Sequence, residues 1–355
     1  MLISLVASLA LAADSPTTLS GEPVPPAPPA PLTLPKEEKK FPDIKMSGLL
    51  YAHYLYMLPE SAEGYNEFGL DRAYLIAKSK LSPHLATRLT LDADRTKVPT
   101  DSTGVPVSGV DTKYRVFVKH AYLESSWTKY GLKARGGIID TPYTGFYDSF
   151  IGIRYIRESF PKQYKLLDTA DAGVGLYGTH ADGLFDWNAS LLNGEGYSNL
   201  ETDKGKQVNA RVTVDPLASG GELSLPITVY GSMNGQPSTV GDPIVILIGA
   251  VGFKQKYIAA WAEYDMATQG DHNYGGYSAT LHPMAPDIGG VIFRYDYADP
   301  NNDADDDALS AIVAGLTHDF TPDMVSIAAT YEVSSLEGTD DPLLETIFVH
   351  MQAGF

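Results

Sequence analysis

The chain has 355 residues, 44% of them apolar, and a formal net charge of −18 that comes from 26 basic and 44 acidic residues. It contains no Cys, which excludes disulfides, thiolate zinc sites, covalent haem attachment and cysteine catalysis. Because so acidic a chain would repel a polyanion, we also expect no nucleic-acid partner.

The N-terminus has the features of an export signal. A short apolar stretch begins at Leu2 and ends in small residues at Ala12, which suits signal peptidase, so we predict a signal peptide over residues 1–12. The stretch departs from the usual pattern because no Lys or Arg precedes it. Residues 13–43 are polar and proline-rich, which predicts an extended periplasmic arm, or else a tether to the cell wall or a partner.

The remainder of the chain alternates apolar and polar residues with period two, which is the signal of β-strands. For example, Val208 and Val212 lie on one face of a segment whose other face carries Asn209 and Arg211. No run reaches the roughly 18 apolar residues of a transmembrane helix. The pattern predicts about sixteen strands, an even number that suits a bacterial outer-membrane barrel: 44–57, 67–81, 84–95, 113–127, 131–139, 171–180, 184–194, 206–215, 222–233, 243–254, 257–267, 273–282, 289–299, 309–319, 323–334 and 344–355.

The pattern leaves some strands ambiguous. Strand 243–254 is apolar on both faces, so the pattern does not tell which face points inward. Strands 67–81 and 113–127 are also ambiguous in register.

The connections alternate in length. Tight turns follow every second strand, and longer polar stretches lie between them, at 96–112, 140–170, 195–205, 234–242 and 299–308. This alternation is typical of a transmembrane barrel. If the first strand leaves the periplasm, the long loops fall outside the cell and 140–170 is the third of them. A soluble propeller or solenoid would alternate as well, but the export signal, the loop lengths and the last strand favour an all-β transmembrane barrel over 44–355.

The last strand carries the strongest mark of a membrane barrel. Counting back by twos from Phe355 gives Ala353, Met351, Val349 and Ile347, which are all apolar. This ending resembles the C-terminal signal by which the barrel assembly machinery recognises outer-membrane proteins, and its physical basis is an edge strand with one apolar face. We therefore predict an assembly signal that includes Phe355, Met351 and Val349, and a location in the cell outer membrane.

The stretch 132–197 resembles Gram-negative outer-membrane porins, broadly the phosphate-selective porin O/P-like group. The residues that carry the resemblance are Gly136-Gly137-Ile138-Ile139-Asp140-Thr141-Pro142-Tyr143, Arg154-Tyr155-Ile156, Asp171-Ala172-Gly173-Val174-Gly175-Leu176 and Leu192-Asn193-Gly194-Glu195-Gly196-Tyr197. The resemblance implies a water-filled pore, often a homotrimer, for passive diffusion of small hydrophilic solutes or ions. Phosphate-specific members use dense arrays of Lys and Arg, which this acidic chain lacks, so phosphate selectivity is not carried over.

Loop 140–170 contains more aromatic and aliphatic residues than an exposed loop needs. In porins of this size the third loop folds into the lumen, and we expect the same here, with a surface loop on the rim as the alternative. The predicted constriction consists of Asp140, Tyr143, Tyr147, Asp148, Arg154, Arg157 and Glu158. The predicted pore lining consists of seven bases, Arg72, Lys78, Arg88, Lys133, Arg135, Arg211 and Arg294, which makes the constriction mixed and slightly basic.

The remaining features predict no chemistry. The eight His are scattered, and no His-x-x-x-His pair, nucleophile elbow or Walker loop occurs, so we expect no catalytic residue, no metal site, no cofactor and no enzyme activity. Acidic loops near 299–307 and 337–341 are expected to be solvated, or else to bind Ca²⁺ or Mg²⁺ next to lipopolysaccharide. The expected partners are outer-membrane lipids, lipopolysaccharide and the assembly machinery. The alternative function is a closed barrel that serves as an adhesin, a structural anchor or a sheath for a partner protein.

Overall fold

The computed structural model describes residues 41–59, 62, 64–95, 113–201, 203–218, 223–235, 241–285, 288–321, 324–339 and 342–355. The predicted signal peptide, nearly all of the proline-rich arm and the predicted loop 96–112 lie outside these residues. No helix within them is both long enough and apolar enough to cross a membrane.

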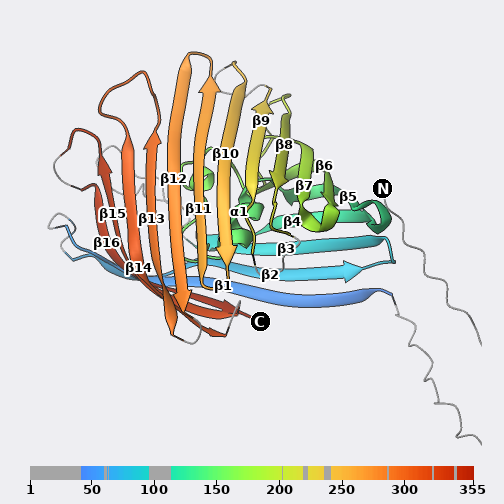
Figure 1. Cartoon of the computed structure of the whole chain (residues 1–355), viewed down its shortest axis with the longest axis horizontal. Coiled ribbons are helices and arrows are strands. Elements are labelled where there is room, and N and C mark those ends of the chain that lie inside the picture. Colours follow the sequence, from blue (N-terminus) through green and yellow to red (C-terminus); the bar gives the residue numbers. More distant parts are fainter. Residues whose placement is uncertain are drawn as a thin grey trace, which may run out of the picture. The chain divides into compact units, whose positions relative to one another are not determined.

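The described chain forms one closed antiparallel barrel of sixteen strands, in which each strand pairs with its neighbours in sequence and β1 closes on β16 (Figure 1). The predicted fold class and strand number are confirmed. The strands are β1 (Asp43–Met57), β2 (Asn66–Lys80), β3 (Leu85–Arg95), β4 (Tyr114–Trp127), β5 (Leu132–Asp140), β6 (Ala170–His180), β7 (Phe185–Leu192), β8 (Gln207–Val214), β9 (Ile227–Asn234), β10 (Ile244–Gln255), β11 (Ile258–Gln269), β12 (His272–Ala285), β13 (Gly289–Asp299), β14 (Leu309–Thr321), β15 (Val325–Leu336) and β16 (Leu344–Gly354).

One predicted strand boundary is wrong by five residues. Strand β9 begins at Ile227 and not at residue 222. Pro226 precedes it, and a proline has no N–H to donate to the neighbouring strand. Upstream of this proline, Ser224 makes a single isolated bridge to Lys254 of β10, so the pairing continues only as a fragment.

The barrel is polar inside and apolar outside. On β8, Asn209 and Arg211 are 1% and 7% exposed, whereas Val208 and Val212 are 51% and 42% exposed. A soluble sheet protein would bury the valines and expose the polar face. The observed polarity is that of a barrel whose outer surface faces lipid, which argues against the soluble alternative.

Strand β10 resolves one of the ambiguities of the sequence. Its inward residues Ile246 and Ile248 are buried, and Leu247 is exposed on the outside. The inward face can be apolar because Ile246 and Ile248 belong to the hydrophobic cluster that they form with residues of the segment between β5 and β6.

A β-bulge explains why the register of β4 was ambiguous. Thr90 of β3 pairs with His120 of β4, but Leu91 pairs with Val118, so Lys119 is an extra residue on β4. A bulge of this kind changes the direction of a side chain. Lys119 and His120 consequently both lie on the inner face although they are adjacent in sequence, and they are 6% and 3% exposed.

The two ends of the barrel differ in their connections. We call the end that carries turns such as Leu81–His84 and Lys256–Tyr257 the turn side, and the end that carries the segment between β5 and β6 the loop side. Two connections depart from this division. The connection between β8 and β9 is long although it lies on the turn side, and Gly270–Asp271 is a tight turn on the loop side.

The last residue helps to close the barrel. Phe355 and Gly48 exchange two backbone hydrogen bonds, from Gly48 N to Phe355 O at 2.8 Å and from Phe355 N to Gly48 O at 3.1 Å. The ring of Phe355 covers Gly48 so closely that a Cβ there would lie 2.0 Å from it. The outward face predicted for the last strand is observed, because Ile347, Val349 and Met351 are all exposed.

Candidate functional site

The segment between β5 and β6, residues 141–169, packs against the inner wall of the barrel. We call it the lumen segment. It contains α1 (Thr144–Ile151) and α2 (Phe160–Gln163), and Figure 1 shows α1 in green among the strands. Helix α1 ends at Gly152, whose φ of 77° lies in the left-handed region that favours glycine. The contacts of this segment determine which part of the lumen stays open.

An aromatic cluster attaches α1 to β11. The indole ring of Trp261 has its centroid 5.4 to 6.4 Å from the rings of Tyr143, Phe146, Tyr147 and Phe150. Such edge and tilted geometries stabilise aromatic pairs beyond the area they bury. We call this set the aromatic anchor. It holds one face of α1 against the wall and directs the opposite face toward the rest of the lumen.

Arg294 of β13 adds a polar attachment. Its guanidinium donates to the backbone oxygen of Glu158 at 2.7 Å and to the hydroxyl of Tyr147 at 3.4 Å, and Asp296 accepts from its Nε at 2.8 Å. Arg294 is 1% exposed. It therefore lies on the inner face but beneath the lumen segment, where it supports this segment; it is not among the residues that line the three cavities, so the predicted position in the pore lining is not observed.

Further polar contacts attach the lumen segment along the same part of the wall. Arg157 donates to Asp296 of β13 at 3.2 Å and to Glu332 of β15 at 3.1 Å. Lys254 of β10 donates to the backbone oxygen of Phe150 at 2.7 Å. The segment is thus held against strands β10 to β15.

The free face of the lumen segment carries an ion pair toward β1–β4. Arg154 donates to Asp148, and its second terminal nitrogen lies 3.4 Å from Glu158. Burial raises the pKa of the Asp148 carboxyl, although Arg154 opposes this shift. Burial would also raise the pKa of Glu158, but Arg154 and Arg72 outweigh it and hold that pKa below its usual value.

Arg72 of β2 lies on the barrel wall next to the ion pair of Arg154 with Asp148 and Glu158. Its guanidinium lies 3.0 Å from Asp92, 3.1 Å from Asp94 and 3.5 Å from Glu158. Arg72 therefore connects the wall to the lumen segment through Glu158. Opposite charges face each other at close range here, as expected for a mixed constriction.

Three adjoining cavities follow the wall formed by β1–β5. A loop-side cavity of about 630 Å³ meets a neck of about 170 Å³, and both are lined by Tyr51 and Arg154. The neck meets a turn-side cavity of about 300 Å³, and both are lined by Arg88. These cavities define a candidate path through the barrel.

The fixed charge changes sign along this path. The loop-side cavity is lined by five acids, Glu67, Asp71, Asp94, Glu158 and Glu332, and by three arginines, Arg72, Arg154 and Arg157. The neck has two acids, Asp140 and Asp148, and three bases, Arg88, Lys119 and Arg154. The turn-side cavity has two acids, Asp43 and Glu124, and six bases, Lys45, Lys78, Lys80, Arg88, Lys133 and Arg135.

Most of the predicted site residues line this path. From the predicted constriction they are Asp140, Asp148, Arg154, Arg157 and Glu158, and from the predicted lining they are Arg72, Lys78, Arg88, Lys133 and Arg135. Four lie elsewhere. Tyr143 and Tyr147 are fully buried in the aromatic anchor, Arg294 lies beneath the lumen segment, and Arg211 stacks over Phe146, with its guanidinium carbon 4.1 Å from the ring centroid, and pairs with Asp186.

Sequence reasoning missed three residues that shape the site. In the sequence, Trp261 is one more apolar residue of a predicted strand. The residues next to it in the sequence do not indicate that four aromatic rings contact it. Tyr51 and Lys119 line the neck. The inward position of Lys119 depends on a bulge, which leaves no signature in the alternation beyond the ambiguity already noted.

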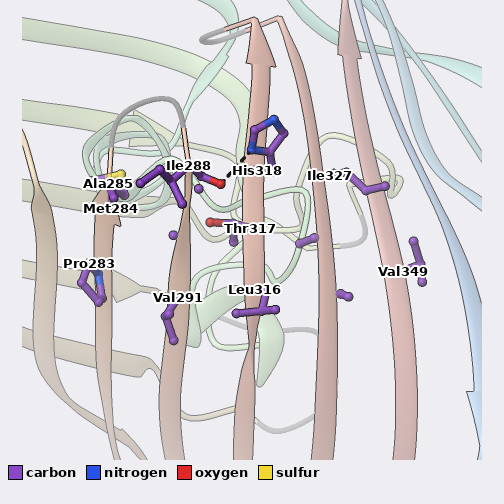
Figure 2. A pocket seen from close by; sticks show the side chains of 14 residues that line it. Pro283, Met284, Ala285, Ile288, Val291, Leu316, Thr317, His318, Ile327 and Val349 are labelled. Carbon is purple, nitrogen blue, oxygen red and sulfur yellow. Dashed lines mark hydrogen bonds between the residues drawn. The ribbon is translucent and has the colours of Figure 1, made fainter.

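The outer wall carries a separate apolar groove of about 700 Å³. Figure 2 shows that Val291, Leu316, Ile327 and Val349 come from neighbouring strands and that His318 reaches toward the backbone oxygen of Ile288, which is 3.2 Å from its Nδ1. These apolar side chains belong to the exposed outer face, so this groove is part of the lipid-facing surface and not of the path.

The acidic loops gather no cation site within the part of the chain that the structure describes. No group of three His, Asp or Glu side chains there comes close enough to hold a metal ion. Asp340 and Asp341 of the predicted acidic loop lie outside that part.

No protein-family model and no curated protein sequence matches the chain. Solved structures match in fold. OmpT of Vibrio cholerae in its trimer form has 12% identity and a TM-score of 0.57, with 88% of this chain and 99% of that chain covered. The anion-selective porin from Comamonas acidovorans has 13% identity and a TM-score of 0.58, with 88% and 100% covered. The high-pH structure of Pseudomonas putida OprB has 8% identity and a TM-score of 0.61, with 88% and 94% covered. The chain therefore has the fold of outer-membrane barrels.

Proposed function

We propose that this chain is a porin of the outer membrane, which forms a water-filled channel for passive diffusion of small hydrophilic solutes or ions. The observation that carries the proposal is the row of three adjoining cavities along β1–β5. Two further points support it: the outer wall is apolar where lipid would touch it, and the similar structures include a protein that is described as an anion-selective porin.

The lumen segment is the constriction in this proposal. With the turn side toward the periplasm, it is the third loop-side connection, and it narrows the lumen from within. Because it is attached to β10–β15, the candidate path runs between its free face and β1–β4. A further cavity of about 840 Å³, whose lining includes Lys162, Lys165 and Tyr197, adjoins the loop-side cavity at Arg72 and Glu158. Arg72, Arg154 and Glu158 then line the loop-side cavity, and Asp148 and Arg154 line the neck. Opposite charges at these positions would set up a transverse field that orders water and slows apolar solutes.

Electrical recording tests the proposal. We expect purified, folded protein to give discrete ohmic conductance steps in a planar lipid bilayer. A closed barrel that serves as an adhesin, anchor or sheath would give no steps, so silence from protein that is demonstrably folded would contradict the channel.

Thiol labelling tests the path itself, because the chain has no Cys of its own. Gly145 lines the neck, and a Cβ built there meets nothing within 4 Å, so Gly145→Cys is sterically acceptable. We expect a bulky thiol reagent to reduce the conductance of Gly145→Cys. Leu247→Cys on the lipid-facing side of β10 is the matched control and should keep its conductance.

We further propose that the chain assembles as a homotrimer, which the resemblance to porins implies and which agrees with the trimer form of a similar structure. Cross-linking of the protein in native membranes, followed by denaturing electrophoresis, would give a ladder that ends at three copies. A ladder that never passes one copy would contradict the trimer.

A further inference from the structure

We propose that Lys119 is the residue that gives the neck a preference for small anions such as chloride or the carboxylate of a small organic acid. This inference rests on the proposed channel function. It starts from the bulge on β4, which places Lys119 beside His120 on the inner face of the barrel as an extra residue without a partner on β3.

The surroundings of Lys119 hold its ammonium group without neutralising it. Its Nζ donates to the hydroxyl of Tyr74 at 2.9 Å and lies 4.8 Å from the centroid of that ring and 5.6 Å from the ring of Tyr197. Aromatic faces stabilise a cation without carrying a charge. Among the described residues, no carboxylate makes an ion pair with Lys119.

The neighbouring arginines differ from Lys119 in this respect. The guanidinium of Arg72 is paired with Asp92 and Asp94, and that of Arg154 is paired with Asp148. Each of these cations therefore contributes mainly a dipole to the path. Lys119 contributes a net charge at the smallest of the three cavities, where the field of a single charge is least shielded by water.

The other acids and bases around the neck do not cancel the positive charge that Lys119 contributes. Asp140 lies 2.7 Å from Nε2 of His120 and 3.2 Å from Arg135, so its charge is already shared between two partners. Arg88 stands at the boundary with the turn-side cavity and donates to Thr90 at 3.0 Å. An anion that passes from the loop side therefore leaves an acidic cavity, meets Lys119 in the neck and continues into a basic cavity.

The test uses the full chain in planar bilayers under a KCl gradient, with the reversal potential as the readout. The variants are Lys119→Met, which removes the charge, Lys119→Gln, which also keeps a polar partner for Tyr74, and Lys119→Arg, which keeps the charge. Lys256→Met is the control, because it removes the same charge from an exposed turn outside the path.

We expect the chloride-to-potassium permeability ratio to fall about tenfold or more in Lys119→Met and Lys119→Gln, because one unit charge at about 5 Å in water changes the population of each ion about fourfold, in opposite directions for chloride and potassium. Lys119→Arg and Lys256→Met should keep the parental ratio. A parental ratio in a folded, conducting Lys119→Gln overturns the proposal. Failure of both neutral variants to fold also overturns it, since Lys119 would then be structural. Absence of conductance in the parent would instead contradict the channel function itself.

Discussion

Arg154 and Asp148 form an ion pair, and we expect the loss of stability to depend on which of the two side chains is removed. In Asp148→Ala, Arg154 keeps a second carboxylate, because Glu158 lies 3.4 Å away. In Arg154→Ala, Asp148 keeps no ion pair among the described residues, although Lys119 lines the same neck, and its side chain is only 15% exposed. An uncompensated charge in a buried position is strongly unfavourable. We therefore expect Arg154→Ala to be the more destabilising change.

The size of the effect follows from the burial of the pair. Breaking a buried ion pair by removing one partner costs about 3–5 kcal/mol. Asp148 can reduce this cost by taking up a proton, because burial already raises its pKa and Arg154 is the main group that opposes the shift. We expect Arg154→Ala to lower the free energy of unfolding by about 2–4 kcal/mol after this relief. We expect Asp148→Ala to lower it by less than half as much.

Ion selectivity should move in opposite directions in the two variants. Asp148→Ala leaves more positive charge in the neck and should favour anions. Arg154→Ala leaves more negative charge and should favour cations. This shift should become smaller as the pH falls, because the Asp148 carboxyl, whose pKa burial raises, takes up a proton.

Two measurements check these expectations on the same samples. Urea unfolding in detergent or lipid gives the difference in stability, and reversal potentials in a KCl gradient give the direction of selectivity. Equal loss of stability in both variants would contradict the argument that Arg154 keeps a second carboxylate, Glu158, whereas Asp148 loses its ion pair. Selectivity shifts of the same sign would contradict the position of the pair on the path.

Other changes have equally direct outcomes. Trp261→Ala removes the centre of the aromatic anchor and should lower the free energy of unfolding by about 3–5 kcal/mol, with noisier single-channel currents; unchanged noise and stability would contradict the anchor. In the parent, protonation of Asp148, whose pKa is raised by burial, should shift permeability toward anions as the pH falls, and Asp148→Asn should lack this contribution in a pH series of reversal potentials. Gly137→Ala should abolish the folded band in heat-modifiable electrophoresis, because φ is +126° and a Cβ would lie 2.1 Å from a backbone oxygen of β4, whereas Gly136→Ala should fold, since its nearest contact is 3.9 Å. Phe355→Ala should reduce assembly in cell outer membranes more than refolding in detergent, and equal loss in both would contradict an assembly signal.

The barrel could be predicted from the sequence because its determinants are local. Period-two alternation reports which side chains face lipid, and tight turns limit where strands end, so even β13 is predicted to the residue. The prediction of where β9 begins was wrong because Pro226 interrupts the strand pairing, while the apolar pattern of the sequence continues across this proline. Alternation measures the polarity of faces and does not measure whether a backbone hydrogen bond can form.

The site was less accessible to sequence reasoning because its determinants are not local. The composition of 140–170 indicated a segment with an apolar side, but the partner of that side, Trp261, lies more than 90 residues further along. Arg294 was predicted to line the pore because it faces inward, but facing inward does not distinguish a residue on the path from one beneath the lumen segment. That distinction depends on which wall the segment covers.

The charge of the whole chain is also a poor guide to the charge of the path. The net charge of −18 suggests a channel that repels anions. Yet the turn-side cavity has six bases against two acids, and many of the remaining acids lie in loops such as Asp299–Asp307, away from the neck. Because salt screens charges beyond about 10 Å, ions in the neck respond to the groups that line it. Selectivity should therefore follow single substitutions at Lys119 or Arg154, and removal of loop acids should leave it nearly unchanged.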